Sequence, residues 1–154
     1  MTLDLLRGHA FLAGMPDGHL QTLAGLAEEV CFQEDEVILR AGERSAHFYL
    51  LLSGSVCVEA NARAVAVRVQ ALSDGEAFGW SALLDHHDTL FQVRARERST
   101  ALRLERQRLA AACRADPVLG AELLRRTLRL VAGRVQATEA RLGELCGMRM
   151  PRQS

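Results

Sequence analysis

The segment at residues 75–93, with the sequence GEAFGWSALLDHHDTLFQV, contains the residue types best suited to binding a ligand. The run WSALL follows Gly79 directly and is long enough for one helical turn, which would point backbone N–H groups toward one spot. Such donors attract an anion, for example a phosphate. We therefore predict a ligand cassette at 75–93 in which Gly79, Trp80, Ser81 and Ala82 contact the ligand.

Other reactive side chains in the sequence form no recognisable catalytic or metal-binding pattern. His86 and His87 are adjacent in a polar loop, where neighbouring side chains of an extended segment point apart and share an ion poorly. The cysteines are scattered, at positions 31, 57, 113 and 146, with no CxxC pair and no histidine at ligand spacing. Ser81 has no motif that would supply a base. We predict no metal site, no catalytic residue and no enzymatic activity.

Composition gives no reason to expect a nucleic-acid or membrane surface. The 154-residue chain balances 19 basic residues, all of them arginine, against 19 acidic ones. Its first residues, MTLDLLRGHAFLAG, contain no apolar run of the length of a signal peptide or membrane helix. We predict a soluble cytoplasmic protein with one main domain and no membrane contact.

The elements that must position the cassette change type along the chain. Residues 1–28 are predicted to be helical, with leucines at helical spacing after an N-cap at Asp17. Residues 29–115 contain roughly eight short runs of β-branched and aromatic residues separated by turn signals, which predicts an antiparallel β-roll of the jelly-roll type. In one run Val65, Val67 and Val69 alternate with Ala66 and Arg68, which predicts one dry face.

A long helix is predicted at 116–148, followed by a polar tail at 149–154. Asp116 followed by Pro117 is an N-cap with proline at the first helical position. Apolar residues then recur at intervals of four and three, with Thr138 in the one polar slot, which predicts a two-stranded coiled coil. The predicted dimer interface comprises Leu124, Leu128, Val131, Val135, Leu142 and Leu145. We expect a homodimer through this helix.

Several phrases of the sequence carry a resemblance to a known family. They are AGE at 41–43, HFYLLLSGSVCVE at 47–59, GEAFG at 75–79 and ADP at 115–117. Together with the order of helices, β-roll, cassette and long helix, the chain resembles the cyclic-nucleotide-binding domain of the catabolite-activator (Crp/Fnr-like) family of bacterial regulators. The similarity covers roughly residues 15–147. It implies a mainly β fold with flanking helices and a long C-terminal dimerisation helix.

The resemblance also shows where the cassette departs from the family pattern. Members that bind cyclic AMP use a glutamate just after the first cassette glycine and an arginine about ten residues later. By this resemblance Trp80 occupies the position of the glutamate and Thr89 that of the arginine, and Leu90 replaces a small polar neighbour. Each lost charged hydrogen bond is worth about 1.5–3 kcal/mol. We therefore expect that cyclic AMP does not bind in the usual way. Trp80 either stacks on a base or fills the space of the ribose.

Two residues of the long helix resemble family positions that face the ligand. The threonine that contacts the purine corresponds to Thr138, and a preceding arginine corresponds to Arg134. Alternatives remain for both residues. Thr138 could serve only to fix the register of the coiled coil, and Arg134 could pair with Glu139 of a second subunit.

The sequence thus predicts a small-molecule-sensing regulatory domain, with a cyclic nucleotide or another small anionic effector as its ligand. Ligand binding would reposition the cassette against Thr138 and shift the long helices, and a partner protein would detect that shift. The alternative is a ligand-free dimerisation or protein-interaction module. Family transcription factors continue into a helix-turn-helix domain of about 60–80 residues. If the chain is complete at MRMPRQS, we expect no direct DNA binding by that route.

Overall fold

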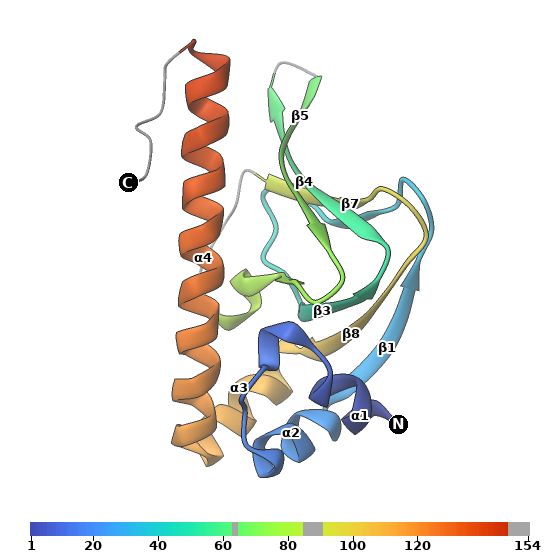
Figure 1. Ribbon diagram of the computed structural model, residues 1–154, viewed down its shortest axis with the longest axis vertical. Helices are drawn as coiled ribbons and strands as arrows, with labels where there is room; N and C mark the ends of the chain where they lie inside the picture. The colour runs from blue at the N-terminus through green and yellow to red at the C-terminus, as the bar shows by residue number, and fades with distance from the viewer. Residues whose placement is uncertain (63–64, 85–90, 148–154) are drawn as a thin grey trace.

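Two antiparallel sheets form a β-roll, with short helices at one end and one long helix alongside (Figure 1). The computed structural model describes residues 1–62, 65–84 and 91–147. Its helical elements are α1 (Thr2–Arg7), η1 (Ala10–Leu12), α2 (Asp17–Ala24), η2 (Trp80–Leu83), α3 (Arg106–Ala115) and α4 (Pro117–Leu145). The predicted fold class, an antiparallel β-roll with flanking helices and a long C-terminal helix, is confirmed.

Each sheet has four strands. The first has the order β1-β8-β3-β6 and the second the order β2-β7-β4-β5. The strands are β1 (Ala27–Phe32), β2 (Val37–Leu39), β3 (His47–Ser53), β4 (Ser55–Ala62), β5 (Val65–Ser73), β6 (Ala77–Phe78), β7 (Phe91–Ala95) and β8 (Ser99–Glu105).

Strand β3 is buried on both faces, which explains its continuous apolar sequence. Phe48 and Leu50 pack against the helices in one hydrophobic cluster, whereas Tyr49 and Leu51 pack between the sheets in the other. Successive side chains of a strand point to opposite faces, so an HFYLLLS run serves two cores at once. The helices therefore cover the outer face of the first sheet, and the space between the sheets is a second core.

The N-terminal segment differs from the prediction in two details. Asp17 is the first residue of α2 rather than its N-cap, and its carboxylate accepts a hydrogen bond from Arg7 Nε at 2.8 Å. Residues 27 and 28 belong to β1 rather than to a helix, because Ala27 lies opposite Leu104 in the first sheet. Arg126 of α4 fastens this segment by donating to the carbonyl of Phe11 at 3.1 Å and to that of Ala13 at 2.7 Å.

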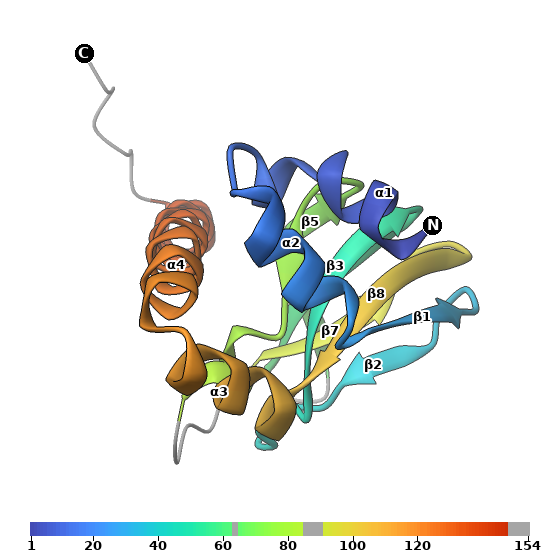
Figure 2. The same cartoon turned by 90° about the horizontal axis from the view of Figure 1, so that it is seen from below.

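The long helix α4 begins as predicted. The Asp116 side chain accepts from the N–H groups of Val118 and Leu119, and Pro117 occupies the first helical position. Leu119 and Leu123 are buried in the helical cluster. Figure 2, a view close to the axis of α4, shows the roll and the other helices on one side of it.

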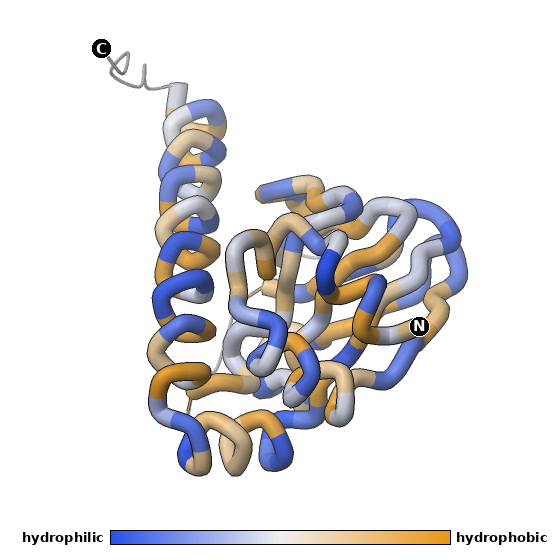
Figure 3. Tube along the Cα trace, turned by 60° about the horizontal axis from the view of Figure 1, so that its bottom comes forward, coloured by the Kyte–Doolittle hydropathy of each residue, from blue (hydrophilic) through white to orange (hydrophobic). Residues whose placement is uncertain are grey.

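An exposed flank of α4 carries a stripe of apolar residues. Leu124, Leu128, Val135, Leu142 and Leu145 are each about half exposed or more, from 49% for Val135 to 69% for Leu128. Figure 3 shows apolar positions recurring along the full length of the helix. No helix in the part of the chain that the structure describes combines the length and the apolar character needed to cross a bilayer.

Candidate ligand-binding site

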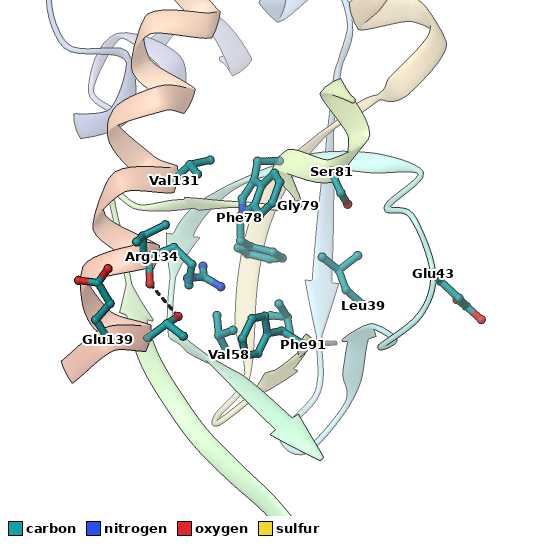
Figure 4. A pocket seen from close by; sticks show the side chains of 14 residues that line it. Leu39, Glu43, Val58, Phe78, Gly79, Ser81, Phe91, Val131, Arg134 and Glu139 are labelled. Atoms are coloured by element: carbon teal, nitrogen blue, oxygen red, sulfur yellow. Dashed lines mark hydrogen bonds between the residues drawn. The ribbon is translucent and has the colours of Figure 1, made fainter. Parts of the chain in front are cut away.

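A cavity of about 390 Å³ lies between the β-roll, η2 and α4 (Figure 4). Strands β2, β4, β6 and β7 form its wall, and η2 and α4 close it. The lining residues are Leu39, Glu43, Val58, Phe78, Gly79, Trp80, Ser81, Phe91, Val93, Val131, Arg134, Val135, Thr138 and Glu139.

The strand wall is apolar because it consists of the inward-facing residues of neighbouring strands. Val58 of β4 lies directly opposite Val93 of β7, and Leu39 of β2 lies opposite Val93 on its other side. Phe91 lies two residues before Val93 and therefore shares its face. This wall offers a ligand hydrophobic contact rather than hydrogen bonds.

Gly79 places η2 against the cavity, and its backbone conformation demands glycine. Its φ is +81°, and a Cβ at this position would lie 2.7 Å from the carbonyl oxygen of His47. The η2 turn uses one of its own backbone donors, because the N–H of Ala82 donates to the Gly79 carbonyl at 3.0 Å. Ala82 is packed in the helical core cluster and does not line the cavity.

Ser81 contributes a hydroxyl to the cavity. Its Oγ accepts a hydrogen bond from the backbone N–H of Ser45 at 3.1 Å, which fixes the side chain and leaves its proton for another acceptor. Ser81 is buried, with 6% of its surface exposed. It is therefore a preoriented donor beside the apolar wall.

Arg134 is the one arginine among the described residues that line the cavity, and it is buried, with 8% of its surface exposed. Its Nε donates to the Gln70 side-chain oxygen at 2.8 Å, which turns the side chain away from solvent toward β5. Burial lowers the pKa of the guanidinium from its ordinary value, and the charge of Glu76 acts in the opposite direction. An arginine in such surroundings remains charged at neutral pH.

Thr138 lies one turn beyond Arg134 on the same face of α4. Its hydroxyl donates to the Arg134 carbonyl at 2.8 Å, as the dashed line in Figure 4 shows. The hydroxyl oxygen can still accept a bond from a ligand. Thr138 and Val131 both border the cavity, although both were predicted on the seam of the coiled coil.

The structure brings together most of the residues predicted to contact the ligand. Gly79, Trp80, Ser81, Arg134 and Thr138 line one cavity although they come from two distant parts of the chain. Their binding of a ligand stays a prediction. Thr89 and Leu90, and the paired histidines at 86 and 87, lie outside the described residues.

The geometry also bears on the alternatives for Trp80 and Arg134. Trp80 borders the cavity without filling it, because about 390 Å³ remains beside it. Arg134 faces inward and is bonded to Gln70, whereas the side chain of Glu139 is exposed and points away from the cavity in Figure 4. Arg134 is thus directed to the interior of its own chain.

The prediction missed the strand residues that form the apolar wall. They are Leu39, Val58, Phe78, Phe91 and Val93, together with Glu43 and Glu139 at the edge. Alternation along the strands marks the apolar ones as inward-facing, but it does not distinguish a packed core from a cavity wall. Over the described ranges, no group of three or more His, Cys, Asp or Glu could share a metal ion.

Comparison with known proteins identifies the family. Residues 29–116 of the 154 match the model of the cyclic nucleotide-binding domain. A cGMP-dependent protein kinase from Toxoplasma gondii is 29% identical over 86 residues, which make up 56% of this chain. The match spans only 8% of the length of that kinase.

Solved structures share the fold. A cyclic nucleotide-binding protein from Geobacter metallireducens matches with a TM-score of 0.77 and 24% identity over 88% of this chain and 98% of its own. The regulatory subunit of a cAMP-independent protein kinase A from Trypanosoma brucei, as a triple mutant bound to cAMP in its A site, matches with a TM-score of 0.72 and 22% identity over 94% of this chain and 50% of its own. With more than half of its length matching the family model, the chain belongs to the cyclic nucleotide-binding domain family.

Proposed function

We propose that this chain is a small-molecule-sensing regulatory domain in which α4 detects the occupant of the cavity. The observation that carries the proposal is that α4 itself closes the cavity, through Val131, Arg134, Val135 and Thr138. A bound molecule would touch both the β-roll and this helix. A ligand shifts a conformational equilibrium when it binds one arrangement of the protein more tightly than another. A ligand in this cavity would do so, because its contacts depend on the position of α4 relative to the β-roll.

The proposed effector is not cyclic AMP held in the usual mode. Trp80 and Thr89 stand where the resemblance puts the ribose-binding glutamate and the phosphate-binding arginine. The Trypanosoma brucei subunit supports this proposal. It belongs to a cAMP-independent protein kinase A. The mutant that was solved with cAMP carries alanine in place of a glutamate, arginine in place of a threonine and alanine in place of the valine that follows that threonine. The present chain has the similar pair Thr89 and Leu90.

The output of the domain is proposed to pass through a second copy of the chain. The exposed apolar stripe on α4, defined here as Leu124, Leu128, Val135, Leu142 and Leu145, runs along an exposed flank of the helix, and Val135 also borders the cavity. Together with Val131 and Thr138, which lie between its members, the stripe has the spacing of four and three that suits a parallel coiled coil. A change in the tilt of α4 at the cavity would then alter the dimer, and a partner protein would respond to it.

A thermal-shift panel tests the sensing function. Cyclic mononucleotides, cyclic dinucleotides, nucleosides and small organic acids are each added to the full chain at high concentration. A ligand at about 100 times its dissociation constant stabilises the folded state by about 2.7 kcal/mol. At least one class is expected to raise the melting temperature; if none does across a broad panel, sensing is refuted and α4 acts as an interaction module only.

Restoring the family anchors gives a second test of the cavity. The triple variant Trp80→Glu, Thr89→Arg, Leu90→Ala is expected to bind cyclic AMP at least tenfold more tightly than the unmodified chain, because it regains the two charged groups. The matched control Arg129→Gln, on the exposed side of α4, should not change cyclic AMP binding. Isothermal titration calorimetry measures both. An unchanged affinity in the triple variant would contradict the assignment of these positions.

A further inference from the structure

We propose that the effector is a compact, largely apolar molecule with a single carboxylate, bound with its apolar body against the strand wall and its carboxylate on Arg134. This inference rests on the proposed function, since it names the chemical class of ligand for the same cavity. It differs from the family expectation because the anion would be held by the long helix and not by the cassette.

The lining determines the character of the ligand body. Eight of the lining residues have apolar or aromatic side chains: Leu39, Val58, Phe78, Trp80, Phe91, Val93, Val131 and Val135. Among the described lining residues the inward polar groups are few, namely Ser81, Arg134 and Thr138, and the Thr138 proton is already donated to a backbone carbonyl. Polar atoms that enter an apolar cavity without hydrogen-bond partners cost free energy. A ribose, with several hydroxyls, suits this cavity poorly.

Arg134 determines the charge of the ligand. The hydrogen-bond partner of its side chain among the described residues is the neutral amide of Gln70, and no described carboxylate forms an ion pair with it. Glu43 and Glu139 are exposed, and Figure 4 shows their side chains directed away from the cavity. Glu76 favours the charged guanidinium without forming an ion pair with it, and a buried guanidinium that lacks a contacting anion is costly. An anionic ligand would supply the missing charge and could use the remaining N–H donors in a forked geometry.

Cavity size and shape limit the ligand further. A volume of about 390 Å³ is at the small end of the usual range for small-molecule sites. Trp80 and Phe91 border this volume with aromatic side chains, which favour a flat hydrocarbon or aromatic body. Ser81 can donate its hydroxyl proton to a ligand oxygen at the other side of the cavity. A bicyclic aromatic acid combines these properties.

Isothermal titration calorimetry on the full chain tests the proposal with matched probes. The acids are 1-naphthylacetate and indole-3-acetate, and the neutral counterparts of the same shape are 1-naphthylacetamide and indole-3-acetamide. Each acid is expected to bind about 10- to 100-fold more tightly than its amide, as a charge-assisted pair requires. In Arg134→Gln this preference should disappear, whereas the exposed Arg129→Gln should keep it.

The outcomes separate this inference from the proposed function. If the amides bind as tightly as the acids, or if Arg134→Gln keeps the preference, the assignment of the carboxylate to Arg134 is overturned while sensing stands. If cyclic AMP or guanosine binds and no acid does, the ligand class is overturned and sensing again stands. If no probe of any class binds, both fail. Should Arg134→Gln not fold, the acid-against-amide comparison on the unmodified chain still decides the result.

Discussion

His9 shows how one buried residue connects the N-terminal segment to the turn that opens the cassette. It is 4% exposed, and its Nε2–H donates to the Leu51 carbonyl at 2.9 Å while Nδ1 accepts from the Phe11 N–H at 3.3 Å. Both bonds need the neutral imidazole with its proton on Nε2. The same Leu51 carbonyl also accepts from the N–H of Gly75. His9 thus holds η1 against the start of the cassette.

The pH dependence of stability follows from this environment. Burial lowers the pKa of His9, partly offset by its bond to Leu51. The unfolded chain therefore binds more protons than the folded one once the pH falls below the ordinary histidine pKa of about 6.5. The contribution of His9 to the free energy of unfolding should therefore be complete above that pH. It should decrease as the pH falls from there through the pKa of His9 in the folded state. Burial lowers the pKa of His47 too, which adds a contribution of the same sign.

Urea denaturation at a series of pH values, with His9→Gln as the comparison, measures this effect. Because His9 would take up about one proton on unfolding in this range, its removal should make the decline shallower, leaving the part due to His47. An equally steep decline in His9→Gln would show that His9 does not titrate on unfolding.

At the scale of elements, two glycines have opposite roles. Gly79 joins β6 to η2 in a left-handed conformation with backbone and side chains close to its Cα, whereas Gly133 lies inside α4 with no heavy atom outside its own helix within 4 Å of the place that a Cβ would occupy. The first is required by geometry, and the second only weakens a helix. They form a matched pair for mutation.

The prediction is that alanine changes stability in opposite directions at these two positions. Gly79→Ala should lower the free energy of unfolding by about 1–3 kcal/mol or more, because its φ is unfavourable and the His47 carbonyl obstructs the new methyl. Gly133→Ala should raise it by up to about 1 kcal/mol, since alanine is the better helix former. Chemical denaturation of both variants measures this. If Gly79→Ala is as stable as Gly133→Ala, the described conformation at Gly79 is wrong.

At the scale of the whole molecule, the exposed apolar stripe of α4 is a surface that the single chain leaves uncovered. We predict that the double variant Leu128→Glu, Leu142→Glu is monomeric where the unmodified chain is dimeric, because it places like charges in the seam. Neither residue lines the cavity, so ligand binding can be followed separately. The control Arg129→Glu changes charge outside the seam. Light scattering distinguishes the two states, and a persistent dimer would refute pairing through this stripe.

Local patterns in the sequence predicted much of this architecture. The β-roll, the cap at Asp116 and Pro117 and the length of α4 all follow from short-range signals, namely turn residues, alternation and helical spacing. The position of η2 beside the cavity follows from a local signal too, because Gly79 precedes a segment too short for a full helix. These features depend on residues close together in the chain.

Features that depend on distant pairing could not be predicted in the same way. Val65 is 63% exposed although alternation suggested a dry face, and it pairs with Ala62 at the far end of the ladder between β4 and β5. The inward direction of Arg134 depends on Gln70, which lies 64 residues away in the chain. Helical spacing alone assigned Val131 to the dimer seam, yet it borders the cavity. Such pairs carry no local signal.

The bonds from Arg126 to the carbonyls of Phe11 and Ala13 give α4 a fixed point, and the consequence is mechanical. At about 1.5 Å per residue, the cavity at Arg134 lies about 12 Å beyond this point and the end of the helix at Leu145 about 28 Å beyond it. If α4 pivots as a rigid rod, a displacement at Arg134 is more than doubled at Leu145. In the proposed dimer, a ligand too small to move the roll would in this way move the C-terminal ends of the two α4 helices apart or together. A partner protein would detect that change in distance.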